Sequence, residues 1–295
     1  MNLQYLTIDE LSVLDKPNTF VIIPLGSCEQ HGPHLPLGTK SFLSETIAFM
    51  AYNKLKDEDY SCIVTPTVPF MPCKNNEGFP GVFGMSPRTY SDALFEIGNS
   101  FAADGFKCIF FVNLSVSPDA LKAVETAVND LNTLPGFRAF DPMPLWNFTQ
   151  DDILLDYLKA MNIDPKNELH GDIKETSALL SLDPTLIRQK VLSILQDCRA
   201  NSNWEMLKGN FTFKEMGSID GYLGSPSKAN KDLGQLYLQQ AANALAESMK
   251  YVSQGNELPD LPIQIRTLLK LRNRRHTISN FSLLEQMNGK KHLRT

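Results

Sequence analysis

Short apolar runs alternate with longer stretches of helical length through the first half of the chain. The runs have the length of buried strands and lie at Phe20 to Leu25, Cys62 to Val68 and Cys108 to Val112. The longer stretches predict helices over Ser41 to Leu55, Thr89 to Asp104 and Asp119 to Leu131. Strands that alternate with helices indicate an α/β fold with a mostly parallel central sheet covered by helices.

The second half of the chain predicts further helices and then changes character. One helix begins near Glu175 and closes over Leu179 to Leu182, and a long final helix covers Lys231 to Tyr251. From Ser253 onward the chain has eight Lys or Arg against three Asp or Glu. We therefore expect one domain over residues 1–252 and a basic C-terminal extension over residues 253–295. The extension is either an oligomer clasp, a contact for an acidic partner, or a surface-packed tail.

Composition narrows the class of protein. A formal net charge of -5 gives no general basic field, so nucleic-acid binding is not expected. No apolar run reaches the roughly 18 residues that a membrane span needs, and the N-terminus has no signal-peptide pattern. The five cysteines are scattered without any Cys-x-x-Cys pair, which argues against a disulfide framework and a zinc knuckle. We expect a cytoplasmic protein with a small-molecule substrate.

The residues with the clearest chemical potential directly follow the first predicted strand. The run from Gly26 to Gly38 is punctuated by Gly and Pro, and it carries Glu29, His31 and His34. A carboxylate and an imidazole two residues apart are a hard and a borderline metal ligand side by side. In parallel sheets, sites form at the carboxyl ends of the strands, where this loop lies.

This run closely resembles the signature of the creatininase (creatinine amidohydrolase) family. Similar motifs recur in the same order at Phe79-Pro80-Gly81, Gly105 to Asn113, His170 to Ser177 and Gly221 to Ala229. The resemblance implies a three-layer α/β/α fold and assembly as a homo-oligomer, often a hexamer. It also implies a two-metal centre that activates a water for attack on an amide or cyclic amide carbon.

The chain departs from the family pattern at three ligand positions. Lys40 stands where the family has the Asp that bridges both metals, and Ser115 and Ser117 stand where it has a His and sometimes a Glu. Two like unit charges 4 Å apart repel by roughly 4 kcal/mol at an effective dielectric constant near 20. A second metal beside Lys40 is therefore disfavoured. We expect a degenerate site with no metal or a single zinc or manganese ion, held by Glu29 and His31.

Three hypotheses for function remain open at this point. The first is a hydrolase that cleaves a C–N bond of a small or cyclic amide. The second is a metal-free enzyme of altered chemistry, such as a lyase, an isomerase or a biosynthetic tailoring enzyme, that uses Lys40. The third is a pseudoenzyme or assembly subunit. The candidate catalytic residues are Glu29, Lys40, His170 and Glu175, and the candidate substrate-binding residues are His34, Ser115 and Ser117.

Overall fold

Four parallel strands form the central sheet. The computed structural model describes residues 1–149, 152–200, 205, 210–263 and 265–267. The strands lie in the order β2 (Cys62–Val64), β1 (Phe20–Leu25), β3 (Cys108–Asn113) and β4 (Arg138–Phe140). The chain divides into two compact units, Met1–Leu258 and Pro259–Thr295, and the sheet belongs to the first.

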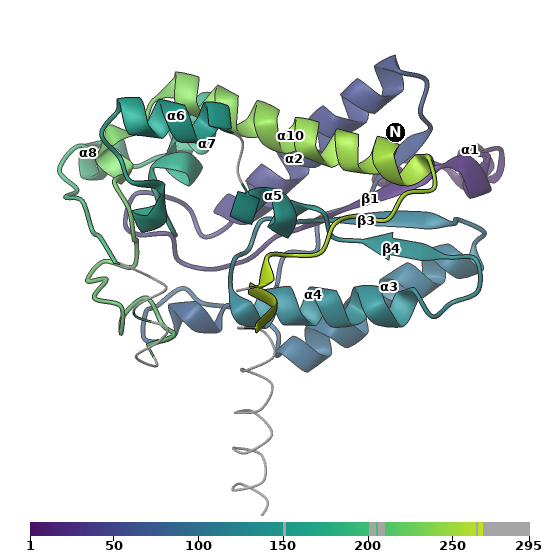
Figure 1. The fold of residues 1–295 in the computed structure, drawn as a ribbon, viewed down its shortest axis with the longest axis horizontal. Helices are drawn as coiled ribbons and strands as arrows, with labels where there is room; N and C mark the ends of the chain where they lie inside the picture. Colours follow the sequence, from purple (N-terminus) through teal and green to yellow (C-terminus); the bar gives the residue numbers. More distant parts are fainter. Residues whose placement is uncertain (150–151, 201–204, 206–209, 264, 268–295) are drawn as a thin grey trace, which may run out of the picture. The chain divides into compact units, whose positions relative to one another are not determined.

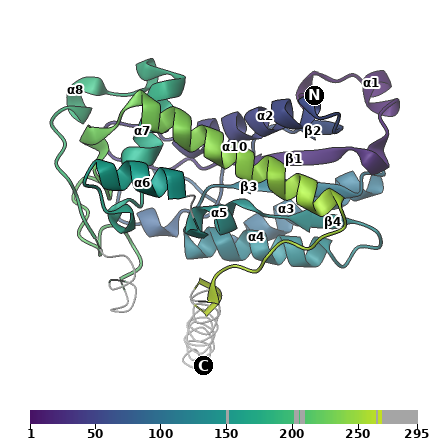
Figure 2. The same ribbon diagram turned by 45° about the horizontal axis from the view of Figure 1, so that its top comes forward.

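Helices cover both faces of the sheet and make three layers (Figures 1 and 2). One face is covered by α2 (Thr39–Asp57) and α10 (Lys231–Ser253), and α7 (Ile173–Leu182) packs against α10. The opposite face is covered by α3 (Pro87–Ala103) and α4 (Pro118–Leu131). The remaining described helices are α1 (Ile8–Ser12), α5 (Met143–Thr149), α6 (Asp152–Ala160) and α8 (Gln189–Leu192). Short 3-10 helices are η1 (Leu3–Tyr5), η2 (Lys16–Asn18), η3 (Lys74–Asn76), η4 (Pro165–Asn167), η5 (Pro184–Leu186) and η6 (Pro226–Lys228).

Strand β1 lies between β2 and β3 and contributes to both halves of the core. Successive side chains of a strand point to opposite faces of the sheet. Val21, Ile23 and Leu25 accordingly pack on the side of α3 and α4, and Ile22 packs on the side of α2 and α10. All four side chains are completely buried. A strand buried on both faces reads as a continuous apolar run, which is why the sequence predicted it.

The fold class predicted from the sequence is confirmed, and the element boundaries differ in detail. Strand β1 has the predicted bounds. Strand β2 is shorter than predicted, because Pro66 has no N–H to donate to the ladder, and only an isolated bridge joins Val68 to Leu25. Helix α10 extends two residues beyond the predicted end. Among the described helices, none is long and apolar enough to cross a membrane.

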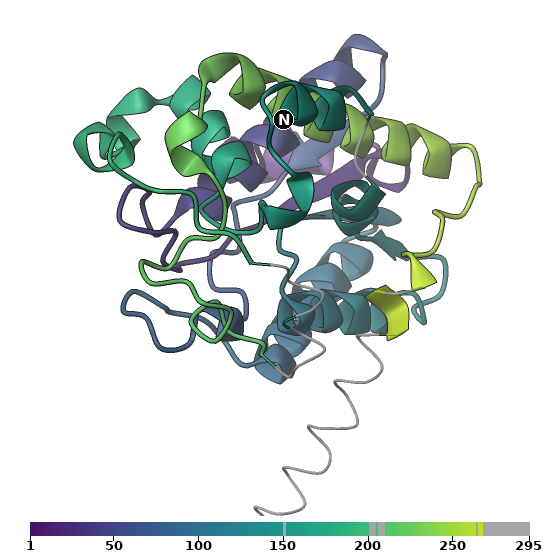
Figure 3. The same ribbon diagram turned by 60° about the vertical axis from the view of Figure 1, so that its left-hand side comes forward.

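The loops that follow the strands gather at one edge of the sheet. Leu25 pairs with Asn113, so the loop that carries Glu29 and the loop that carries Ser115 leave the sheet side by side. Figure 3 turns the loop-rich side of the molecule toward the reader. The fold thus brings together segments that are about ninety residues apart in sequence, in the place where α/β sheets form their sites.

Candidate active site

A buried ion pair lies at the centre of the site. The backbone N–H of Glu29 donates to the carbonyl of Leu37 at 3.0 Å and fixes the loop after β1. Lys40, in the first turn of α2, donates from Nζ to Glu29 Oε1 at 2.7 Å. Lys40 is 5% exposed and Glu29 is 2% exposed. The lysine therefore points inward and occupies the interior of the site.

A relay of side-chain amides holds the other oxygen of Glu29. Asn76 Nδ2 donates to Glu29 Oε2 at 2.6 Å, and Gln30 Nε2 donates to Asn76 Oδ1 and to the carbonyl of Gly221 at 2.8 Å. Gly221 has a φ of 91°, and a side chain there would overlap the Gln30 amide. Sequence analysis missed Asn76 and Gln30. The signal for Gln30 was its place inside the motif, next to Glu29.

Electrostatics keep both members of the ion pair charged. Burial alone would raise the pKa of Glu29, but Lys40, His170 and His31 together outweigh burial, and the pKa lies well below its usual range. Burial alone would lower the pKa of Lys40, but the carboxylates of Glu29 and Glu175 raise it above its usual value. A permanently charged ammonium is neither a base nor a Schiff-base amine. The geometry therefore argues against those two roles for Lys40.

His31 presents a free nitrogen lone pair to the carboxylates. Its Nδ1 lies 2.9 Å from the carbonyl oxygen of Glu29, which accepts only, so Nδ1 carries the proton. Its Nε2 is then the unprotonated nitrogen. That atom is buried without a hydrogen-bond partner among the described residues, 3.9 Å from Glu29 Oε1 and 3.9 Å from Glu175 Oε2. Burial lowers the pKa of His31 and keeps the ring neutral.

His170 is oriented in the same way from the other side. Its Nε2 donates to the carbonyl of Gln30 at 2.6 Å, which leaves Nδ1 unprotonated and, among the described atoms, without a partner. Burial, followed by the influence of His31 and Lys40, lowers the pKa of His170 to about 3. Its ring lies 4.4 Å from that of His31 and stacks on Phe213 at 4.5 Å. Both imidazoles are thus fixed as neutral acceptors.

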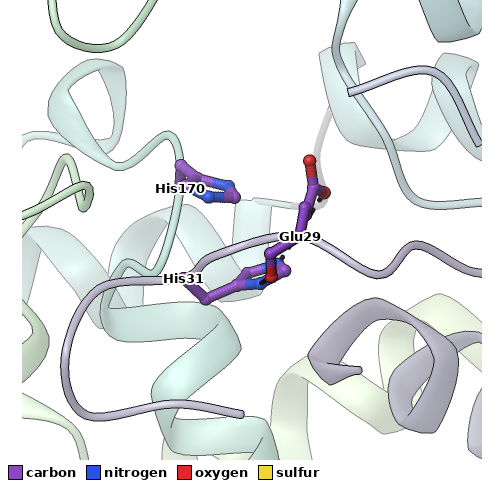
Figure 4. Close-up of side chains that lie close together, drawn as sticks. All are labelled: Glu29, His31 and His170. Carbon is purple, nitrogen blue, oxygen red and sulfur yellow. Dashed lines mark hydrogen bonds and ion pairs between the residues drawn. The ribbon is translucent and has the colours of Figure 1, made fainter. Parts of the chain in front are cut away.

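These groups fit one divalent cation. Ligand atoms of Glu29, His31 and His170 all lie within 4.8 Å of one another, and the three side chains converge in Figure 4. Two imidazoles and one carboxylate are also the protein ligands of several catalytic zinc sites. Sequence analysis expected Glu29 and His31 as the residual ligands, and the structure adds His170. Lys40, bonded to Glu29, stands where the resemblance places the residue that bridges two metals.

The remaining candidates lie around this centre. Glu175 Oε2 accepts from the N–H of Gly171 at 2.7 Å, and its side chain is 13% exposed. Burial would raise the pKa of Glu175, but His31 and Lys40 lower it overall, so it is a carboxylate. His34 is fully buried, and its Nε2 lies 2.9 Å from the Thr176 hydroxyl. That contact ties the motif loop to α7.

Ser115 and Ser117 are buried in the loop after β3. The N–H of Ser115 donates to Asn113 Oδ1 at 3.0 Å, and the N–H of Ser117 donates to Ser115 Oγ at 3.2 Å. The carbonyl of Ser117 accepts from the N–H of Leu121 at 2.9 Å, so this loop is tied to the end of β3 and to the first turn of α4. The structure thus brings Glu29, Lys40, His170 and Glu175 into one cluster, and it places the two serines on the neighbouring loop.

A three-layer α/β/α fold thus presents a carboxylate and two imidazoles at the carboxyl edge of its sheet. The creatininase family profile, described as creatinine amidohydrolase, matches residues 4–249. The chain therefore belongs to the creatininase family of hydrolases, as its motifs suggested.

Curated relatives of known name are peptidases. The mycofactocin precursor peptide peptidase of Mycolicibacterium smegmatis is 28% identical over 186 residues, which cover 56% of this chain and 74% of that protein. Its counterpart in Mycobacterium ulcerans is 23% identical over 171 residues, which cover 52% of this chain and 68% of that protein. Both relatives are distant.

Solved structures with the same fold are creatininases. A manganese creatininase superimposes with a TM-score of 0.67 at 18% identity, covering 84% of this chain and 97% of that one. A mutant creatininase of Zn–Zn type has a TM-score of 0.67 at 17% identity, covering 84% and 96%. A creatinine amidohydrolase from Bacteroides fragilis has a TM-score of 0.63 at 19% identity, covering 88% and 98%. At these identities the likeness establishes the fold.

Proposed function

We propose that this protein hydrolyses the C–N bond of an amide with a single divalent cation, zinc or manganese, at its centre. The observation that carries the proposal is the pair of buried imidazole nitrogens, one on His31 and one on His170, that lack a hydrogen-bond partner among the described residues, on two rings whose ligand atoms cluster with Glu29 within 4.8 Å. Orphaned buried nitrogen atoms are unfavourable, and a bound cation would satisfy both. The Zn–Zn and Mn forms of creatininases in the same fold support these two metals.

Charge balance supports one cation rather than two. The site contains two carboxylates, Glu29 and Glu175, and one ammonium, Lys40, beside two neutral imidazoles. Its formal charge is therefore -1. A single divalent ion brings it to +1, whereas a second ion would bring it to +3 in a buried environment. Buried charge without a counter-charge is strongly unfavourable.

Each residue of the proposed site has a distinct part in this reaction. Glu29, His31 and His170 would hold the cation, which when bound polarises a carbonyl and lowers the pKa of a water. Glu175 is the more exposed carboxylate and accepts the proton of the attacking water. Lys40 has one hydrogen-bond partner among the described residues, so its remaining N–H groups are available to a developing oxyanion.

The relatives favour a peptide-like amide as the substrate. The curated relatives are peptidases of a precursor peptide, whereas the neighbouring structures are creatininases, whose name denotes a cyclic amide. We extend the sequence-based proposal of a small or cyclic amide to peptide amides, and rank the peptide first because those relatives share more identity with this chain. His34, Ser115 and Ser117 are proposed to line the substrate's path.

The test is hydrolysis of a peptide-amide panel and of creatinine by protein stripped of metal and reloaded with zinc or manganese. The proposal predicts activity that returns with metal and is lost in His170→Ala. The matched control is Lys54→Ala, an exposed residue on the same helix as Lys40. Turnover by stripped protein, or metal-loaded protein inert on every amide, would refute the proposal.

The setting of the protein is also proposed from its family resemblance. We propose a cytoplasmic homo-oligomer with a hexamer as the first assembly to test, and a basic extension over residues 253–295 that contributes to assembly. Residues 268–295 lie outside the described part of the chain. Light scattering of the full chain measures the assembly state. The same measurement on a chain ending at Leu258 tests whether the extension contributes to assembly.

A further inference from the structure

A half-buried carboxyl group with one inaccessible oxygen lies at the carboxyl edge of the sheet, outside the Glu29 cluster. Asp141 directly follows β4, and its Oδ2 accepts from Asn113 Nδ2 at 3.0 Å. Its other oxygen, Oδ1, is inaccessible and has no hydrogen-bond partner among the described residues. The described residues also provide no ion pair for it. Burial raises the pKa of Asp141 to about 8, so the group is largely a neutral carboxylic acid at pH 7.

Asn113 connects this acid to the loop after β3. The Asn113 amide is fixed at both ends, because Nδ2 donates to Asp141 and Oδ1 accepts from the N–H of Ser115. Ser115 Oγ in turn accepts from the N–H of Ser117, the residue before α4. The contacts form one continuous chain of hydrogen bonds from the end of β4 to the start of α4. Each residue in this series of hydrogen bonds is held by the residue before it.

This chain of hydrogen bonds runs beside the proposed active site. Asn113 pairs with Leu25, the last residue of β1, and the Glu29 loop begins at the residue after that strand. In the described part of the chain, Asp141 has no hydrogen bond or ion pair to the proposed cation ligands, so its link to the site runs through Asn113 and the loop after β3.

We propose that Asp141 is a positioning residue: it fixes the Asn113 amide and, through it, the Ser115–Ser117 loop that lines the substrate's path. The consequence for substrate rests on the proposed function. The ordering of the loop does not, because it follows from the hydrogen bonds alone. An Asn at this position retains an oxygen acceptor for Asn113, whereas an Ala does not.

Amide hydrogen exchange over residues 113–117 tests the ordering directly in the full chain. Loss of one hydrogen bond corresponds to roughly tenfold faster opening. We expect Asp141→Ala to speed exchange at the Ser115 and Ser117 amides roughly tenfold, and Asp141→Asn to leave it within about twofold. Asp130→Ala, an exposed aspartate on α4, is the matched control. Where Asp141→Ala does not fold, Asp141→Ser replaces it, because its side chain is too short to reach Asn113.

Kinetics on the metal-loaded protein test the consequence for substrate. We expect Asp141→Ala to raise KM roughly tenfold with a smaller change in kcat, and Asp141→Asn to restore both. Unchanged exchange in Asp141→Ala, or equally fast exchange in Asp141→Asn, would overturn the proposal. Altered exchange in a protein without amidohydrolase activity would instead refute the proposed function and leave the positioning role intact.

Discussion

Lys40 is the residue that most distinguishes this site from the family pattern. The side chain fills a position where a bridging carboxylate was expected, and it does so as a charged, buried partner of Glu29. By the family resemblance, we propose that Lys40 replaces one cation-binding anion by a cation that the chain itself supplies. The remaining donor set suits one ion; Lys40 engages Oε1 of Glu29, and Asn76 engages Oε2.

Removing the ammonium should leave Glu29 buried without a counter-charge. We expect Lys40→Met to lower the free energy of unfolding at pH 7 by about 3 kcal/mol or more, since breaking a buried pair strands the other charge. Because the pKa of Glu29 is depressed, this contribution is present above pH 4.5 and lost as the pH falls below it. Because the pKa of Lys40 is raised, it is lost again as the pH rises beyond 10.5.

Urea unfolding at several pH values measures this effect. Lys54→Met, on an exposed position of the same helix, should change stability by less than about 0.5 kcal/mol. The double variant Glu29→Gln with Lys40→Met should recover much of the loss, because no charge is then stranded. A Lys40→Met protein as stable as wild type would show that the ion pair is not buried as described.

The raised pKa of Asp141 predicts a pH dependence of stability that is opposite in sign to that of Glu29. Its folded pKa of about 8 lies above the ordinary value of 3.8, so the folded state binds the proton more tightly. That contribution to stability is present below pH 3.8 and is lost as the pH rises toward 8. We expect Asp141→Asn to be more stable than wild type by about 5 to 6 kcal/mol at pH 9 and similar to it at pH 4, because the folded and unfolded pKa values differ by about 4 and each pKa unit corresponds to about 1.4 kcal/mol.

Thermal unfolding at pH 4, 7 and 9 measures the Asp141 effect. The exposed Asp130→Asn variant should follow wild type throughout. A constant difference between Asp141→Asn and wild type at all three pH values would contradict the assignment of Asp141 as the group that titrates.

At the scale of elements, the packing of α7 against α10 holds His170 and Glu175 in place. Gly234 in α10 lies directly over the backbone of α7, and a methyl group there would overlap the carbonyl oxygen of Ser177. The N–H of Asn230, just before α10, also donates to Ser177 Oγ at 3.0 Å. The two helices are therefore in contact through their backbones, which leaves little freedom for adjustment.

Gly234→Ala should separate these helices. We expect a loss of about 2 to 3 kcal/mol in the free energy of unfolding, since overpacking of a tight contact outweighs the better helix propensity of Ala. The matched control is Gln239→Ala on the exposed face of α10, which should be nearly neutral. Denaturant unfolding of both variants decides the matter, and a stabilised Gly234→Ala would contradict the close approach.

The sequence predicted the elements that have strong local signals. Strand β1 is a continuous apolar run that ends at Gly26, and its predicted bounds are those observed. Strand β4 was missed because the three residues Arg138–Phe140 carry no periodicity, and only pairing with β3 makes them a strand. The same limit applied to α5 and α6, whose helical pattern is short.

The candidate site likewise contains some contacts that local sequence predicts and others that it does not. Glu29, His31 and Lys40 lie within one short segment, so their proximity could be inferred from spacing. The hydrogen bond from Asn76 to Glu29 joins residues 47 positions apart, and no local pattern encodes it. The orientation of His170 also depends on a backbone carbonyl 140 residues away. Long-range contacts of this kind appear only when the sheet is assembled.

At the scale of the whole molecule, the groups of the proposed site and Asp141 lie at one edge of the sheet. The loops after β1, β3 and β4 supply Glu29, Ser115 and Asp141, and the start of α7 supplies Glu175. We propose that the Lys40 ammonium takes the place of one of the two metals that the family resemblance implies, so that the centre takes one cation per chain.

Elemental analysis of the purified full chain after equilibration with zinc or manganese tests that claim most directly. We predict about one equivalent of metal per chain in wild type, and close to none in His31→Ala and His170→Ala. Wild-type protein that binds two equivalents would show that Lys40 does not replace a metal, and wild-type protein that binds none would remove the cation from the mechanism.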